Sequence, residues 1–118
     1  MVALDPAHLV GIGGALGALA RYYVGQAVDR KSFPLGTLTV NVVGSFVLGL
    51  VTFLAPRESV ALLVGTGACG SFTTFSSFSF DTVRLWEQGR PAVALGNAVV
   101  NLAGALAAIG LAWVVASV

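Results

Sequence analysis

Long apolar stretches alternate with short polar stretches along the whole chain. Four apolar stretches cover residues 7–28, 35–54, 60–85 and 91–118. A helix that crosses a bilayer needs about 20 mostly apolar residues, so each stretch is long enough to span a membrane. None of them alternates polar and apolar positions over its length, as the strands of an outer-membrane barrel do. The pattern predicts an all-α membrane protein in which residues 1–118 form a single domain of four transmembrane helices.

Composition supports this class and excludes several functions. Only 9% of the residues are charged, whereas a soluble domain has about 25%. The net charge of +1 argues against a nucleic-acid partner. Cys69 is the only cysteine, so the chain has no internal disulfide. His8 is the only histidine, and no Ser–His–Asp set can be assembled without it, so the sequence does not predict an enzyme.

The third stretch contains a polar segment, GTGACGSFTTFSSFSFD, at membrane depth. Gly65, Gly67 and Gly70 weaken the helix, because glycine costs about 1 kcal/mol relative to alanine in a helix interior. Hydroxyl residues then alternate with phenylalanines. Such a backbone is tolerated in a membrane only where it is buried in protein or lines a watery path. We therefore expect the third helix to break near its middle, after Gly70, and to carry the functional site.

Chemistry at this break favours an ion. A broken helix leaves backbone carbonyls free, and these could hold a small cation such as Na⁺. Phe75 and Phe78 lie three residues apart on one helix face. An aromatic ring has a positive edge, which together with hydroxyl and amide donors suits a small anion. Ordinary core packing is the alternative interpretation of the phenylalanine pair.

Other polar residues of the apolar stretches allow two interpretations each. Arg21, toward the end of the first stretch, either snorkels to the interface or forms a cationic vestibule for an anion. Asn41 lies near the middle of the second stretch, and Asn97 and Asn101 share one face of the fourth. Amides inside a membrane either hydrogen-bond between helices or form a polar track.

Carboxylates are absent from the centre of every stretch. Asp81 comes late in the third stretch, where we expect it to pair with Arg84. A proton-coupled pump or cation exporter requires a buried acid, so this class is disfavoured. Small four-helix multidrug exporters in particular need a glutamate in the first span, and residues 7–28 contain none. A membrane assembly subunit without transport would not require the hydroxyl and phenylalanine run.

The sequence resembles the Fluc (CrcB) fluoride channels over its whole length. The resemblance rests on three motifs, which are residues 17–22 (GALARY), 36–49 (GTLTVNVVGSFVLG) and, most specifically, 67–82 (GACGSFTTFSSFSFDT). It implies a channel that exports fluoride passively across the cytoplasmic membrane and lowers cytoplasmic fluoride. It also implies an antiparallel, dual-topology homodimer in the lipid bilayer, with two pores along the subunit interfaces.

The resemblance also assigns residues. Phe75 and Phe78 match the pair whose ring edges line each pore, Asn41 matches the pore asparagine, and Arg21 matches the vestibule arginine. The backbone carbonyls of Gly70 and Thr73, from both subunits, match those that hold a structural Na⁺ at the dimer centre. Residues placed near the pore by proximity or as the fourth-helix polar track are Thr74, Ser76, Ser77, Asn97 and Asn101. Ala105, one turn further, adds no polar group.

Lysine and arginine are unevenly distributed over the loops. The first and third loops, with the helix end before the third, carry Arg30, Lys31, Arg84 and Arg90, and the opposite side carries only Arg57. Cytoplasmic loops carry the excess of these residues. The bias predicts cytoplasmic first and third loops, whereas a dual-topology homodimer should have little bias. An oppositely oriented relative is therefore the alternative partner, although the homodimer remains our expectation.

Overall fold

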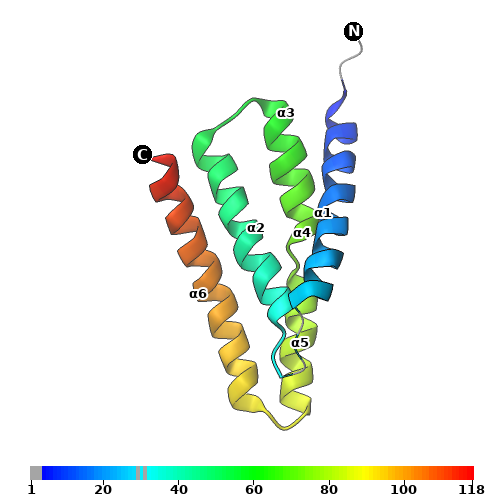
Figure 1. The fold of residues 1–118 in the computed structure, drawn as a ribbon, viewed down its shortest axis with the longest axis vertical. Helices are drawn as coiled ribbons and strands as arrows, with labels where there is room; N and C mark the ends of the chain where they lie inside the picture. Colours follow the sequence, from blue (N-terminus) through cyan, green and yellow to red (C-terminus); the bar gives the residue numbers. More distant parts are fainter. Residues whose placement is uncertain (1–3, 29, 31) are drawn as a thin grey trace.

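A computed structural model describes residues 4–28, 30 and 32–118, and helices make up most of this part (Figure 1). Lys31 lies outside the described residues. The helices are α1 (Pro6–Val28), α2 (Leu35–Leu54), α3 (Glu58–Val60), the π-helix η1 (Ala61–Cys69), α4 (Gly70–Phe72), α5 (Phe75–Glu87) and α6 (Pro91–Ala116). The expected all-α class is confirmed for the described residues. Helices α3, η1, α4 and α5 follow one another along the third apolar stretch.

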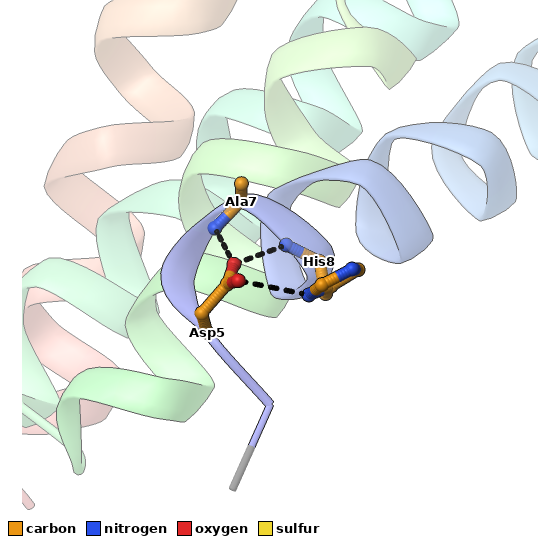
Figure 2. Close-up of polar contacts among 3 residues, drawn as sticks. All are labelled: Asp5, Ala7 and His8. Carbon is orange, nitrogen blue, oxygen red and sulfur yellow. Dashed lines mark hydrogen bonds and ion pairs between the residues drawn. The ribbon is translucent and has the colours of Figure 1, made fainter.

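Asp5 caps the start of α1 (Figure 2). Its Oδ1 accepts hydrogen bonds from the backbone N–H of Ala7 at 3.0 Å and of His8 at 3.2 Å. Its other carboxylate oxygen lies 3.2 Å from His8 Nδ1. Such a cap contributes about 1 kcal/mol, and Pro6 fits the first helical position because its missing N–H needs no partner there. The only histidine of the chain is therefore part of a helix cap.

The helices run up and down along the long axis of the molecule (Figure 1). The start of α1, the end of α6 and the α2–α3 connection lie at one end, and the start of α2 and the α5–α6 connection lie at the other. Helix α2 packs along α6, and α1 packs along η1 and α4, whereas α5 packs on α6. The third apolar stretch therefore changes its main packing partner from α1 to α6 at the point where its helix is interrupted.

Glycines allow α1 and the third stretch to approach closely. A Cβ added to Gly17 would collide with the Ala68 carbonyl oxygen and with Ser71 Oγ. Ser71 Oγ also donates a hydrogen bond of 2.6 Å to the Gly14 carbonyl on α1. Small residues at helix contacts are the usual means of close packing in membranes. The spacing of the glycines in α1 thus reflects packing between helices.

The interruption of the third helix lies at two threonines and not at the glycines. Gly65, Gly67 and Gly70 are all helical. Thr73 (φ −82°, ψ 159°) and Thr74 (φ −152°, ψ 119°) are extended. The prediction that the third helix breaks near its middle, after Gly70, is confirmed, and the extended residues are Thr73 and Thr74. Threonine tolerates extended backbone well and is a good helix cap, and Thr74 caps α5 with its side chain.

Three helical segments of the described chain are long and apolar enough to cross a membrane. They are Leu35–Leu54, Glu58–Glu87 and Pro91–Ala116. Large apolar side chains face outward on them, as lipid contact requires, for example Leu102 and Trp113 on α6. Helix α1 has 23 residues but is not among these segments. The chain is thus a multi-pass membrane protein, and a fourth crossing by α1 remains a prediction.

Candidate functional site

Asn41 of α2 binds the interrupted backbone of the third stretch. Its side-chain Oδ1 accepts a hydrogen bond of 2.7 Å from the Thr74 N–H, and its Nδ2 donates one of 3.0 Å to the Thr74 carbonyl. Thr74 is only 9% exposed. A buried backbone group without a partner costs free energy, and extended backbone inside a helix has lost its regular partners. One amide side chain therefore satisfies both polar groups of the residue at the break.

A chain of amide hydrogen bonds leads from Asn41 into α6 and back to α5. Asn41 Nδ2 also donates to Asn101 Oδ1 at 3.3 Å. Asn101 Nδ2 donates to Asn97 Oδ1 at 3.0 Å and to the Asn97 carbonyl at 2.9 Å. Asn97 Nδ2 donates to Thr82 Oγ1 at 2.9 Å, and Thr82 donates to the Phe78 carbonyl at 2.8 Å. We call Asn41, Asn101, Asn97 and Thr82 the amide chain.

The amide chain uses most of its own donors. An asparagine amide has two N–H donors, and both donors of Asn41 and of Asn101 have acceptors within the protein. Asn97 is fully buried and Asn101 is 6% exposed. The structure thus contains the interhelical hydrogen bonds that one interpretation of these asparagines predicts. A direct contact of these amides with an ion remains a prediction. To donate to an ion, Asn41 or Asn101 would have to give up at least one of these hydrogen bonds.

The same contacts release two backbone carbonyls. In a continuous helix the Gly70 carbonyl would accept from the Thr74 N–H, and the Thr73 carbonyl from the Ser77 N–H. Here the Thr74 N–H bonds to Asn41, and the Ser77 N–H bonds to the Thr74 hydroxyl at 3.1 Å. Among the described residues, the Thr73 carbonyl accepts only from Arg21 Nη1, at 3.5 Å. These are the two carbonyls to which the family resemblance assigns a Na⁺.

Phe75 and Phe78 line a mostly apolar cavity of about 320 Å³. Their ring centroids are 5.6 Å apart, and the ring planes are tilted by 49°. Phe75 is 79% exposed on the single chain. The cavity is also lined by Asn41, Thr73, Thr74 and Asn101, together with apolar residues of α6. The helix break, the phenylalanine pair and two of the asparagines thus come together around one space.

A second cavity, of about 680 Å³, has many polar residues in its lining. Thr74 lines both cavities. Ser76 and Ser77 line the polar cavity, and the Ser76 hydroxyl lies 3.3 Å from the Thr74 hydroxyl. Arg21 also lines it. Most predicted site residues therefore gather around the two cavities. Asn97 and Gly70 line neither of them. A Cβ added to Gly70 would meet no atom within 4 Å outside its own helix, so the space beside Gly70 is open.

Asp81 does not pair with Arg84, so this expectation is wrong. The Thr37 hydroxyl donates a hydrogen bond of 2.7 Å to Asp81 Oδ2. The Arg84 guanidinium lies instead over the Phe80 ring, 5.9 Å from its centroid. The reason is that Thr37 of the neighbouring helix α2 offers the carboxylate a hydroxyl donor. The sequence of α5 alone does not reveal this donor. Asp81, Thr37 and Arg84 all line the polar cavity.

Two threonines that form hydrogen bonds in the site, Thr37 and Thr82, are not among the site residues predicted from the sequence. Thr37 lies one turn before Asn41 on α2, and Thr82 lies one turn after Phe78 on α5. Residues four apart share a helix face. The spacing from Asn41 and Phe78 could therefore have identified both threonines.

Comparison with known proteins identifies the family of this chain. A family model described as CrcB-like protein, Camphor Resistance (CrcB), matches residues 8–113. The fluoride-specific ion channel FluC 2 of Haloarcula marismortui is 68% identical over 96% of this chain and 95% of its own length. The fluoride-specific ion channel FluC 1 of Halobacterium salinarum is 56% identical over 92% of this chain and 91% of its own length. The fluoride-specific ion channel FluC 1 of Methanosarcina barkeri is 42% identical over 92% of this chain and 95% of its own length. Since the match extends over nearly all of the chain and of its relatives, the protein belongs to the CrcB family.

Proposed function

We propose that this protein is a fluoride-selective channel through which fluoride leaves the cytoplasm passively. The observation that carries the proposal is the phenylalanine pair at a broken membrane helix, beside Thr74, which lines both a polar and an apolar cavity. The relatives named fluoride-specific ion channels are similar over nearly the whole chain. This family transports an ion, and the protein is accordingly not an enzyme.

Fluoride is small and strongly hydrated, so a pore must replace its water with donors that also release it. The ion would enter the polar cavity past Arg21 and meet the hydroxyls of Ser76 and Ser77. Thr74, which lines both cavities, would mark the passage to the edges of Phe75 and Phe78. The amide chain would complete the path through Asn41, with Asn101 and Asn97 beyond it. Among the described residues, no carboxylate lines the apolar cavity, so it contains no fixed negative charge to repel an anion.

The working unit would be an antiparallel homodimer in the cytoplasmic membrane, with each pore enclosed between the subunits. The exposure of Phe75 supports this, because an aromatic ring that lines a pore needs a second wall. The alternative partner is an oppositely oriented relative, which the distribution of lysine and arginine favours. Cysteine-accessibility mapping in cells separates the two partners. Equal labelling of both membrane faces is expected of the homodimer, whereas labelling of one face would indicate the relative.

A structural Na⁺ would bind at the dimer centre. The carbonyls of Gly70 and Thr73 fit this ion, because oxygen ligands suit hard cations and both carbonyls are released from helical hydrogen bonds. The open space around Gly70 would allow a second subunit to approach. The ion would neutralise carbonyl dipoles that would otherwise face one another across the dimer axis. Arg21 already donates to the Thr73 carbonyl, whose second lone pair remains available.

Fluoride release from liposomes that contain the purified protein tests the function. We expect rapid fluoride efflux, driven only by the fluoride gradient, and little chloride efflux under the same conditions. Equal chloride flux would exclude selectivity. Absence of fluoride flux would instead favour a non-transporting assembly subunit, and fluoride flux that requires a proton or sodium gradient would indicate an exporter.

A further inference from the structure

Arg84 is a cation at the polar cavity and has no anionic partner among the described residues. Its guanidinium lies over the Phe80 ring, and no carboxylate of the described residues lies within ion-pair distance of it. The neighbouring Asp81 accepts its hydrogen bond from Thr37 on α2. Both Arg84 and Phe80 are exposed to solvent on the single chain and line the polar cavity. A full positive charge is therefore held at this cavity.

The polar cavity consequently carries an excess of positive charge. Two arginines, Arg21 and Arg84, and one carboxylate, that of Asp81, line it. Two positive charges and one negative charge leave a formal net charge of +1. The Asp81 carboxylate accepts a hydrogen bond from the Thr37 hydroxyl. The Phe80 ring beside Arg84 is neutral and does not cancel the charge of the arginine. A cleft with charge of one sign and low-dielectric walls raises the local concentration of the oppositely charged ion.

We propose that Arg84 collects anions for the pore, raising the concentration of small monovalent anions in the polar cavity from which the channel is filled. This inference rests on the proposed function, and it concerns the rate at which the ion enters, not the selection of the ion. Arg21 donates to the Thr73 carbonyl and so belongs to the break itself. Arg84 has no such contact and acts through its field alone. The contact with Phe80, 5.9 Å from the ring centroid, favours this position of the guanidinium only weakly, because the site is exposed.

The test uses salt to screen this field. Liposomes with the intact protein are compared at low and high ionic strength, with the fluoride gradient unchanged and an impermeant salt added. The Debye length falls from about 30 Å at 0.01 M to about 3 Å at 1 M. We expect Arg84→Gln to lower initial fluoride efflux roughly two- to tenfold at low salt, because one charge supplies only part of the roughly 10- to 10³-fold gain of a focused field. We expect no effect at high salt.

Two variants serve as controls. Arg84→Lys keeps the charge and should keep most of the low-salt flux. Arg57→Gln removes an exposed charge that lines neither cavity, and its flux should equal that of the unmodified protein at both salts. An equal loss for Arg84→Gln at both salts would show a structural role and overturn the proposal. No loss at low salt, or an equal loss in Arg57→Gln, would also overturn it. Absence of flux in the unmodified protein would instead contradict the proposed function.

Discussion

The side chain of Asn41 satisfies both backbone polar groups of Thr74, with hydrogen bonds of 2.7 Å to its N–H and 3.0 Å from Nδ2 to its carbonyl. The two residues are 33 positions apart in the sequence. This contact supports the interruption of the third helix, because it replaces the helical partners that Thr74 lacks. It also leaves the Gly70 carbonyl without its helical donor. A single amide of α2 therefore influences both the position of Phe75 and the candidate cation site.

Asn41→Leu should lower both stability and flux. The substitution leaves the buried N–H and carbonyl of Thr74 without partners, at about 1–3 kcal/mol for each group. Thermal unfolding in detergent and fluoride efflux from liposomes measure the two effects. Thr52→Val is a matched control on α2, because the exposed Thr52 hydroxyl bonds only to the carbonyl of Leu48 in its own helix. Unchanged melting of Asn41→Leu would mean that the contact with Thr74 does not support the break.

Phe75→Ile and Phe78→Ile should each cut fluoride flux while leaving the oligomeric state unchanged. Isoleucine keeps apolar bulk at the cavity but has no positive ring edge to face an anion. Efflux from liposomes and size-exclusion chromatography in detergent measure the two properties. Phe53→Ile near the end of α2 is the control, since Phe53 lines neither cavity. Flux that survives both pore substitutions would favour ordinary packing as the role of the pair.

Gly17→Ala and Gly11→Ala should have different effects on stability. The added Cβ at Gly17 meets the backbone of Ala68, which cannot move without displacing the third stretch, whereas Gly11 has open space. Overpacking at such a contact costs about 1–3 kcal/mol. In contrast, alanine at Gly11 should be neutral or stabilising, because alanine is the better helix former. Thermal unfolding of the two variants in the same detergent measures the difference, and equal melting would contradict the close contact.

Removal of Na⁺ should destabilise the dimer. The released carbonyls of Gly70 and Thr73 would face their symmetry mates without a cation between them. We expect lower thermal stability and flux when Na⁺ is replaced by N-methylglucamine, and recovery when Na⁺ is restored. Insensitivity of the unmodified protein to Na⁺ would exclude the site.

Helix boundaries could be predicted closely from the sequence. The expected stretches 7–28 and 35–54 differ by at most one residue from α1 and α2, and α6 starts at the predicted Pro91. These boundaries are local, because they depend on apolar length, on proline and on capping by residues such as Asp5. The shared face of Phe75 and Phe78 is local for the same reason. Thr73, Thr74, Ser76 and Ser77, which line the cavities, also follow from the order of residues in one segment, whereas Thr37 comes from α2.

The sequence by itself determined the class of the protein, the lengths of its helices and the presence of a weak point in the third apolar stretch. Tertiary structure decided where that weak point becomes a break. Gly65 and Gly67 remain helical with neighbouring helices packed on them, and Gly70 remains helical without such a contact. The extended backbone occurs at Thr73 and Thr74, where Asn41 from α2 supplies the missing partners of Thr74. It also decided that Asp81 binds Thr37 and leaves Arg84 unpaired. Hydrogen-bond partners that are tens of residues apart are chosen by helix packing, and the local sequence does not contain that information.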